Sequence, residues 1–334
     1  MIKKKVSRNI KIAGNIIKPG ERKVFTMGAT SLYDFTDLGI PVEVVRGEAQ
    51  GPTLFITAAI HGDEINGFEI IRKLLKRKEL KSIKGTLITV PIVNVFGFNT
   101  KTRYLPDRRD LNRAFPGSKT GSLASRLAYV LMSEIVKKSD YGIDLHTGAI
   151  HRENLPQIRA ALDTAKTLKL AKTFGAPLIL NSKLRDGSLR EAARKRKIPM
   201  LLFEAGEALR FDRSSISVGL HGCLRVMKSL KMIDYKDIEK SHKDYYLAQS
   251  SEWVRAPRGG CVRLKKNLGQ KVIKGEVLGV VSDPFDQNRV PFYAPTGGIV
   301  IGIIKIPLVN LGDAVIHIAT PEKHKPEKNP DILD

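Results

Sequence analysis

His61, Glu64 and His146 have residue types that suit a catalytic metal site. A neutral imidazole and a carboxylate three residues apart can converge on one ion, and two histidines with one glutamate form a zinc set that leaves a coordination position for water. His-x-x-Glu alone is more often a solvated turn, and a lone His146 is explained as well by a hydrogen-bonded core histidine. The interpretation therefore depends on whether the fold brings the three side chains together.

The elements that must position these side chains are short buried strands. Three apolar runs, at 54–60, 141–145 and 199–203, predict strands, and each is followed directly by a polar side chain: His61, His146 and Glu204. From Ile65 the apolar period changes to that of a helix. A strand, a polar turn and a helix in this order are typical of an open α/β sheet, which presents its chemistry at the carboxyl ends of its strands.

The rest of the chain up to 232 continues this α/β pattern. We expect an edge strand ahead of the central one, a further buried strand, a long polar loop rich in arginine and aspartate, and then helices alternating with one more strand. The ranges are 40–45, 85–92 and 94–120 for the first three, helices at 122–138, 157–173, 189–197 and 216–232, and a strand at 177–180.

An internal repeat marks the C-terminal part. Residues 255–262 recur as 293–300, and each copy is followed by a Leu-Gly turn. Such a repeat predicts a small quasi-symmetric β-sandwich or barrel, similar to the lipoyl and biotinyl carrier fold. The segment between the halves, 282–289, contains no lysine that could carry a prosthetic group. A lid or assembly role is therefore favoured over a carrier role.

The change from an α/β pattern to repeated short β-runs predicts the domain organisation. We expect a catalytic α/β domain with N-terminal strands over residues 1–245 and a β-rich C-terminal domain over 246–320. Residues 321–334 are rich in proline and charge, which predicts a flexible tail.

Composition and charge narrow the class of protein. The 334 residues are 42% hydrophobic and 27% charged, as in an ordinary globular protein. No apolar run approaches the roughly 20 residues of a membrane span, and the basic N-terminus lacks the apolar core of a signal peptide, so we expect a cytoplasmic protein without membrane contact. Two cysteines, Cys223 and Cys261, are too few for a disulfide framework.

The formal net charge of +23 needs a separate explanation. A positive surface steers small anions and binds nucleic acid without specificity. Here the charge is scattered, and its densest run, 194–197, ends a predicted helix where cations complement the helix dipole. Because no basic platform with interleaved aromatic residues accompanies it, we expect no specific nucleic-acid partner.

Four motifs in order resemble the succinylglutamate desuccinylase and aspartoacylase family, a branch of the zinc carboxypeptidase superfamily. They are His61-x-x-Glu64, Asp110-Leu111-Asn112-Arg113, Asp144-Leu145-His146-Thr147 and Phe203-Glu204. The resemblance runs from about 40 to 232 and implies a zinc-carboxypeptidase-like mixed sheet flanked by helices. The family's ligands carry over as His61, Glu64 and His146, which implies one Zn²⁺ per subunit. Asp144 either orients a ligand or caps a strand end.

The resemblance also implies roles for residues around the metal. Glu204 resembles the glutamate that takes a proton from water and passes it to the departing amine, and it is favoured over nearby Glu207 because it directly follows the strand. Arg103 resembles the arginine that stabilises the oxyanion of the tetrahedral intermediate. An extended gap before the Asp-Leu-Asn-Arg motif makes Arg108 its rival.

Asn112 and Arg113 resemble the pair that holds the substrate's carboxylate, because a guanidinium fork matches a carboxylate bidentately. The function implied is a zinc-dependent amidohydrolase that cleaves a small, anionic N-acyl amino acid or a related amide through a metal-activated water. Two alternatives remain: a metallocarboxypeptidase acting on short peptides, and a non-catalytic binding protein that retains the fold. The sequence allows a homo-oligomer without specifying one.

Overall fold

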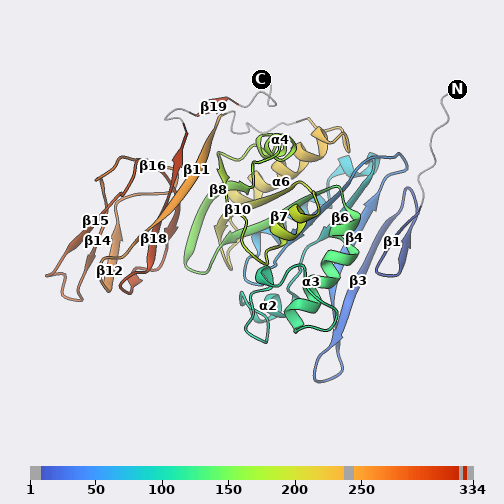
Figure 1. Cartoon of the computed structure of the whole chain (residues 1–334), viewed down its shortest axis with the longest axis horizontal. Coiled ribbons are helices and arrows are strands. Elements are labelled where there is room, and N and C mark those ends of the chain that lie inside the picture. The colour runs from blue at the N-terminus through green and yellow to red at the C-terminus, as the bar shows by residue number, and fades with distance from the viewer. Residues whose placement is uncertain (1–8, 237–243, 323–325, 329–334) are drawn as a thin grey trace.

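The computed structural model describes residues 9–236, 244–322 and 326–328. Its centre is a 13-stranded mixed sheet in the order β13-β16-β18-β11-β9-β8-β10-β7-β5-β6-β4-β3, with β19 paired to β11. The N-terminal and C-terminal strands lie at opposite ends of the molecule, with the helices around the middle (Figure 1). The predicted mixed α/β fold is confirmed.

Four neighbouring parallel strands form the middle of the sheet: β10 (Met200–Glu207), β7 (Tyr141–Gly148), β5 (Thr53–Ala58) and β6 (Thr86–Val90). Within β5, Leu54 and Ile56 pack on one face while Phe55 packs on the other, so the strand is buried on both faces as its apolar run predicts. Parallel pairing aligns the carboxyl ends of these strands, and Glu204 of β10 is directly opposite His146 of β7.

Helices cover both faces of this middle region. One face carries α1 (Asn66–Leu74), α4 (Ala165–Phe174) and α6 (Arg213–Ser229). The other carries α3 (Leu123–Glu134) and α5 (Leu189–Lys195). The side chains of Ser122, Thr164, Ser188 and Asp212 accept hydrogen bonds from backbone amides at the N-termini of α3, α4, α5 and α6, which is why these helices begin where they do.

The N-terminal end differs from the sequence prediction in the position of one strand, and it contains a hairpin that was not predicted. The strand predicted at the edge is β4 (Asp37–Arg46), but it lies between β6 and β3 (Arg22–Ser31), and β3 forms the edge. The small hairpin of β1 (Ile10–Ile12) and β2 (Asn15–Ile17) buries Ile12 and Ile17 in the same core as α3. These two hydrophobic residues explain why an otherwise polar segment is ordered.

The helix predicted at 157–173 is correct only in its second half. Residues up to 160 belong to strand β8 (Arg152–Ala160), and the helix α4 begins only at Ala165. Strand β8 pairs antiparallel with β10 and parallel with β9 (Leu178–Asn181). Pairing on both sides outweighs the local preference of this segment, since strand formation depends on neighbours that lie far away in sequence.

The predicted loop at 94–120 contains two short helices, α2 (Val95–Thr100) and the 3₁₀ helix η2 (Leu111–Arg113). The side chain of Asn94 caps α2, and that of Asp110 caps η2. Further 3₁₀ turns are η1 (Lys78–Ser82) and η3 (Val136–Lys138). Within the described residues, no helix has the length and apolar character to cross a membrane.

The C-terminal strands extend the central sheet and form a second one. Strand β11 (Asp244–Arg255) pairs with β9, so the C-terminal part is hydrogen-bonded to the α/β part. The others are β12 (Gly260–Leu264), β13 (Lys271–Val272), β14 (Val277–Ser282), β15 (Val290–Tyr293), β16 (Gly298–Ile304), β17 (Leu308–Val309), β18 (Ala314–Pro321) and β19 (Glu327–Lys328). A separate sheet has the order β15-β14-β12-β17.

Both copies of the sequence repeat form the same local structure, a turn that leads into a strand, β12 in the first copy and β16 in the second. The glycines of both Leu-Gly turns, Gly269 and Gly312, have positive φ angles of 79° and 84°. A C-terminal β-rich unit is therefore present, whereas its likeness to carrier domains stays a prediction. The boundary predicted at 245/246 falls within β11, and most of the predicted tail lies outside the described residues.

Gly62 fixes the distance between the turn after β5 and helix α2. A Cβ atom at Gly62 would lie 1.9 Å from the carbonyl carbon of Gly97, which is backbone and cannot rotate away. We expect Gly62→Ala to lower the free energy of unfolding by about 3 kcal/mol in urea titration. Gly259→Ala is the control, since its Cβ would meet nothing nearer than 3.6 Å. Equal losses in both variants would contradict this explanation.

Candidate active site

The three predicted metal ligands converge. His61 and Glu64 lie in the turn after β5, and His146 lies within β7, which continues two residues beyond it. One ligand atom from each side chain lies within 4.8 Å of the others, and all three side chains are buried. Parallel pairing of β5 with β7 places the turn beside His146. The fold therefore assembles the set that the sequence predicts.

Hydrogen bonds hold the three side chains in one network. The two carboxylate oxygens of Glu64 each lie 2.7 Å from a histidine Nδ1, Oε1 from His61 and Oε2 from His146. The outer nitrogens also have carboxylate partners: His61 Nε2 is 3.1 Å from Asp110, and His146 Nε2 is 2.7 Å from Asp144. A carboxylate on the far nitrogen of a metal-binding histidine fixes the orientation of its ring.

The electrostatics of this network favour a positive charge at its centre. Burial alone would raise the pKa of Glu64, but the charges of His61 and His146 hold that pKa well below its usual value. Burial lowers the pKa of His146, and Asp144 and Glu64 more than reverse this, so the net shift is upward. Close contacts between the imidazoles and the carboxylates therefore outweigh the effect of burial on Glu64 and His146.

A divalent zinc ion fits this donor set. Two imidazoles and one carboxylate match its preference for nitrogen and oxygen ligands, and the outer carboxylates supply the second layer that such sites use. Asp144 is itself held by the Thr57 hydroxyl, which donates to it at 2.7 Å.

Arg103 lies against the ligand cluster. Its guanidinium donates to Glu64 at 3.2 Å and to Asp110 at 3.0 Å. Burial would lower the pKa of Arg103, but Glu64 and Asp110 raise it overall, so the side chain stays charged. The rival Arg108 is exposed and is not among the described residues that line the cavity. Arg103 is thus the arginine that the fold brings to the metal ligands.

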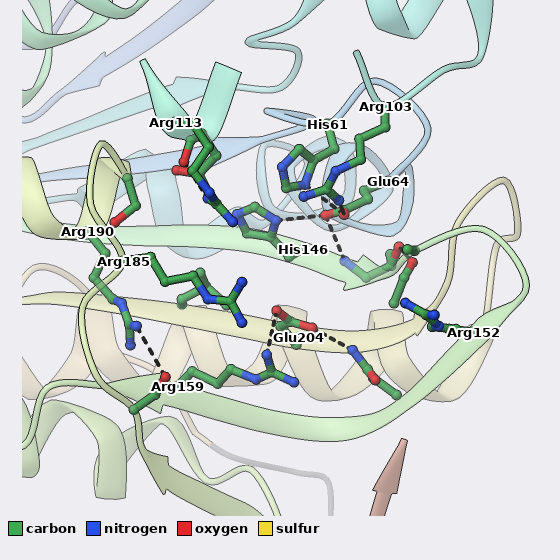
Figure 2. A pocket seen from close by; sticks show the side chains of 18 of the residues that line it. His61, Glu64, Arg103, Arg113, His146, Arg152, Arg159, Arg185, Arg190 and Glu204 are labelled. Carbon is green, nitrogen blue, oxygen red and sulfur yellow. Dashed lines mark hydrogen bonds and ion pairs between the residues drawn. The ribbon is translucent and has the colours of Figure 1, made fainter. Parts of the chain in front are cut away.

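Glu204 lies across the cavity from the ligand cluster (Figure 2). Asn154 of β8 donates a hydrogen bond to its Oε2, and Arg159, also of β8, is 3.3 Å from its Oε1. The other candidate, Glu207, does not line the cavity. Strand β8, part of which was expected to be helical, therefore supplies both side chains that orient Glu204.

Asn112 and Arg113 also line the cavity. The Asn112 side-chain carbonyl accepts a hydrogen bond from the Leu189 amide at 2.9 Å, which leaves its amide NH₂ group for a ligand. Arg113 is exposed and donates to the Asn112 backbone carbonyl. Within the described residues it has no carboxylate partner, so its guanidinium has capacity to bind an anion.

Four more arginines line the cavity, which has a volume of about 210 Å³. They come from β8, from the loop after β9 and from α5, and they are Arg152, Arg159, Arg185 and Arg190. None of the four belongs to the sequence motifs described above. Alternation along a strand at 152–160 would have pointed to Arg159, but no local signal marks Arg185 or Arg190.

The arginines beyond Glu204 are poorly neutralised. Arg190 is only 8% exposed, and its Nη1 has no hydrogen-bond partner in the described structure. Burial, together with the nearby charge of Arg159, lowers the pKa of Arg190 to about 10. His317, which lies on β18, has its pKa lowered to about 3 by burial and by Arg159 and Arg185. This end of the cavity has a strong positive potential.

Trp253 is a cavity residue that the C-terminal part contributes. Its ring stacks on His317 with a centroid distance of 4.4 Å, and the Arg152 guanidinium lies 5.3 Å from its centroid. No motif marks Trp253, although it is the single tryptophan of the chain. The C-terminal strands thus form one wall of the site.

The chain is similar to known proteins over most of its length. The sequence profile of the succinylglutamate desuccinylase/aspartoacylase catalytic domain matches residues 50–230. The chain is also 28% identical over 292 residues to the N-alpha-acetyl-L-2,4-diaminobutyric acid deacetylase of Halomonas elongata. That match covers 84% of this chain and 85% of the relative.

Solved structures show the same architecture over nearly the whole chain. A succinylglutamate desuccinylase/aspartoacylase from Rhodobacter sphaeroides is 26% identical, with a TM-score of 0.83 over 95% of this chain and 99% of that one. The product-bound structure of the ectoine utilization protein EutE (DoeB) from Ruegeria pomeroyi is 24% identical, with a TM-score of 0.79 over 89% and 95%. At this identity the second structure supports the fold alone.

Proposed function

The chain belongs to the succinylglutamate desuccinylase/aspartoacylase family, whose members hydrolyse amide bonds, and we propose that it removes the acyl group from an N-acyl amino acid with one zinc ion. The observation that carries this proposal is the buried cluster of His61, Glu64 and His146 with Glu204 across the same cavity. When bound there, zinc would make a water molecule more acidic and polarise the scissile carbonyl.

The chain's own residues supply the proton transfer and the charge stabilisation. Glu204 accepts a proton from the attacking water and delivers it to the departing amine nitrogen, so that an amide and water become a carboxylate and an amine. Asn154 and Arg159 hold its carboxylate in place. Arg103 donates to the oxygen that becomes negative as the carbonyl carbon turns tetrahedral.

Asn112 and Arg113 define the orientation of the substrate. They bind the carboxylate of the amino acid, which places the leaving amine on their side of the metal ligands and the acyl group on the other side. In Figure 2, Arg113, Arg185 and Arg190 lie on one side of His146, and Arg103 and Arg152 lie on the other. The side chain of the amino acid then points toward Arg185 and Arg190.

This arrangement favours an acidic amino acid over the basic one in the name of the Halomonas relative. A second carboxylate would neutralise Arg185 and the buried Arg190, whereas the ammonium group of a diaminobutyrate would meet uncompensated positive charge. We therefore propose N-acyl derivatives of aspartate or glutamate as better substrates than N-acetyl-2,4-diaminobutyrate. Such a substrate is anionic, as the sequence analysis predicts.

Arg185→Gln tests this preference. Arg185 is exposed and has no hydrogen bond or ion pair from its guanidinium within the described residues, so the variant should fold. We expect KM for an N-acetyl acidic amino acid to rise about 10-fold or more, and KM for N-acetylalanine to change little. The control is Arg194→Gln, which removes an exposed arginine that pairs with Asp163 outside the cavity. Equal changes for both substrates would contradict the assignment.

Amine release from a panel of substrates tests the function itself. The panel contains N-acetyl, N-succinyl and longer N-acyl derivatives of acidic, neutral and basic amino acids, together with dipeptides, all with the zinc-loaded protein. We expect turnover of the acidic N-acyl amino acids. Faster cleavage of the dipeptides would favour the metallocarboxypeptidase alternative, and absence of turnover with full zinc occupancy would favour the non-catalytic one.

A further inference from the structure

A second cavity adjoins the reaction site on the side of the acyl group. Its volume is about 520 Å³, and it lies between the loops of the catalytic part and strands β16 and β17. Arg103, Ala149 and Arg152 line both cavities. The second cavity therefore lies next to the reaction cavity, on the side of Arg103 and Arg152.

Part of the lining of this cavity is hydrophobic. Ile150 of the turn between β7 and β8 lines it together with Ile304, Ile306 and Leu308 of the C-terminal part. Ile150 is 49% exposed and Leu308 is 66% exposed, so both present apolar surface to solvent. Exposed apolar side chains that gather beside a functional site mark a place for an apolar ligand more often than isolated ones do.

The two cavities differ in chemistry in a way that separates the two halves of a substrate. The reaction cavity is lined by arginines and suits carboxylates, whereas the second cavity combines the aliphatic side chains of Ala149, Ile150, Ile304, Ile306 and Leu308 with polar and charged ones. Figure 2 shows Arg152 on the opposite side of the metal-ligand cluster from Arg185 and Arg190. An anionic amino acid at one end and a hydrocarbon chain at the other would satisfy both.

We propose that the groove formed by Ile150, Ile304, Ile306 and Leu308 holds the hydrocarbon chain of the acyl group, and that the enzyme acts on N-acyl amino acids with chains longer than acetyl. This inference rests on the proposed deacylase function and adds the class of acyl group to it. The C-terminal strands thereby contribute to specificity as well as to the wall of the site.

A series of acyl chains measures the contribution of the groove. N-acetyl-, N-butanoyl-, N-hexanoyl- and N-octanoyl-L-aspartate differ only in the number of methylenes. Because burying a methylene contributes up to about fourfold in affinity, we expect kcat/KM to rise at least tenfold from acetyl to hexanoyl. A flat or falling series would overturn the proposal.

A charge placed in the groove should remove the rise of kcat/KM with acyl chain length. In Leu308→Asp a carboxylate replaces an exposed apolar side chain, so we expect the hexanoyl-to-acetyl ratio of kcat/KM to fall about tenfold. Leu311→Asp is the matched control, since Leu311 is 73% exposed, lies three residues away and does not line the groove. An unchanged ratio in Leu308→Asp, or an equal fall in both variants, would overturn the proposal. Ile150→Asp repeats the test from the opposite wall.

A binding measurement separates this inference from the deacylase function. Calorimetric titration of the zinc-loaded Glu204→Gln variant with N-acetyl- and N-octanoyl-L-aspartate reports affinity without turnover. Tighter binding of the octanoyl compound that Leu308→Asp abolishes would support the groove even if the wild-type enzyme cleaved neither compound. Equal affinity for both compounds would overturn the proposed role of the groove. The deacylase function would still be supported if the wild-type enzyme cleaves N-acetyl-L-aspartate.

Discussion

Replacing Glu204 by glutamine is expected to lower kcat by about 10³-fold while KM changes less than threefold. Glutamine has nearly the same shape and its carbonyl can still accept the hydrogen bond from Asn154, but it cannot take a proton from water or give one to the amine. Arg159 loses its anionic partner, which changes the local charge without opening a cavity. The measurement is steady-state amine release at saturating zinc.

Two further measurements exclude loss of metal or of folding as the cause of a lower kcat. Metal content and the thermal unfolding midpoint of Glu204→Gln should match those of the wild type, because Glu204 is not among the proposed ligands. Glu207→Gln is the matched control, since it makes the same change three residues along β10 outside the cavity. If Glu204→Gln kept more than a tenth of the activity, or if Glu207→Gln lost as much, the assignment of the base would be wrong.

Removing a proposed metal ligand should lower activity as strongly, and it should also lower the amount of bound zinc. In His146→Ala, Glu64 Oε2 loses its histidine partner and the proposed site keeps only two ligands. We expect bound zinc after dialysis to fall from about one per chain to below a tenth, with activity at background. Elemental analysis and amine release on the same samples check both.

Stability should follow metal content. A ligand present at about 1,000 times its Kd stabilises the folded state by roughly 4 kcal/mol, so a chelator should lower the Tm of the wild type. The Tm of His146→Ala should respond to neither zinc nor chelator. His221→Gln is the control, because His221 lies on α6 beside Tyr235 and outside the cavity. A wild-type protein whose activity and Tm ignored a chelator would exclude a metal at this site.

The convergence of His61, Glu64 and His146 could be predicted because their placement depends on local sequence. A buried apolar run ends directly before His61, and another leads into His146. Parallel neighbours in a sheet align their ends, so two such strands bring their terminal side chains together whichever loops join them. The same argument identified Glu204 in place of Glu207, because the cavity lies where β10 passes beside His146.

The choice between Arg103 and Arg108 was not decided by the sequence. Both lie in the same polar segment, and their distance from the metal ligands depends on how helix α2 turns the chain back. Asn94 caps α2 and also donates to the Arg103 carbonyl at 3.2 Å, which places Arg103 beside Glu64. Such a contact within a loop produces no periodic pattern in the sequence, so it could not be predicted.

The sequence by itself determined the α/β class, the order of most strands and helices, and the convergence of His61, Glu64 and His146, since these follow from apolar runs and their ends. Only the tertiary structure decided that 152–160 is a strand and that Arg159, Arg185 and Arg190 face one cavity with Trp253. Those residues come from four separate elements whose approach is set by long-range strand pairing. Substrate charge and acyl length are inferred from that packing, so no single stretch of sequence encodes them.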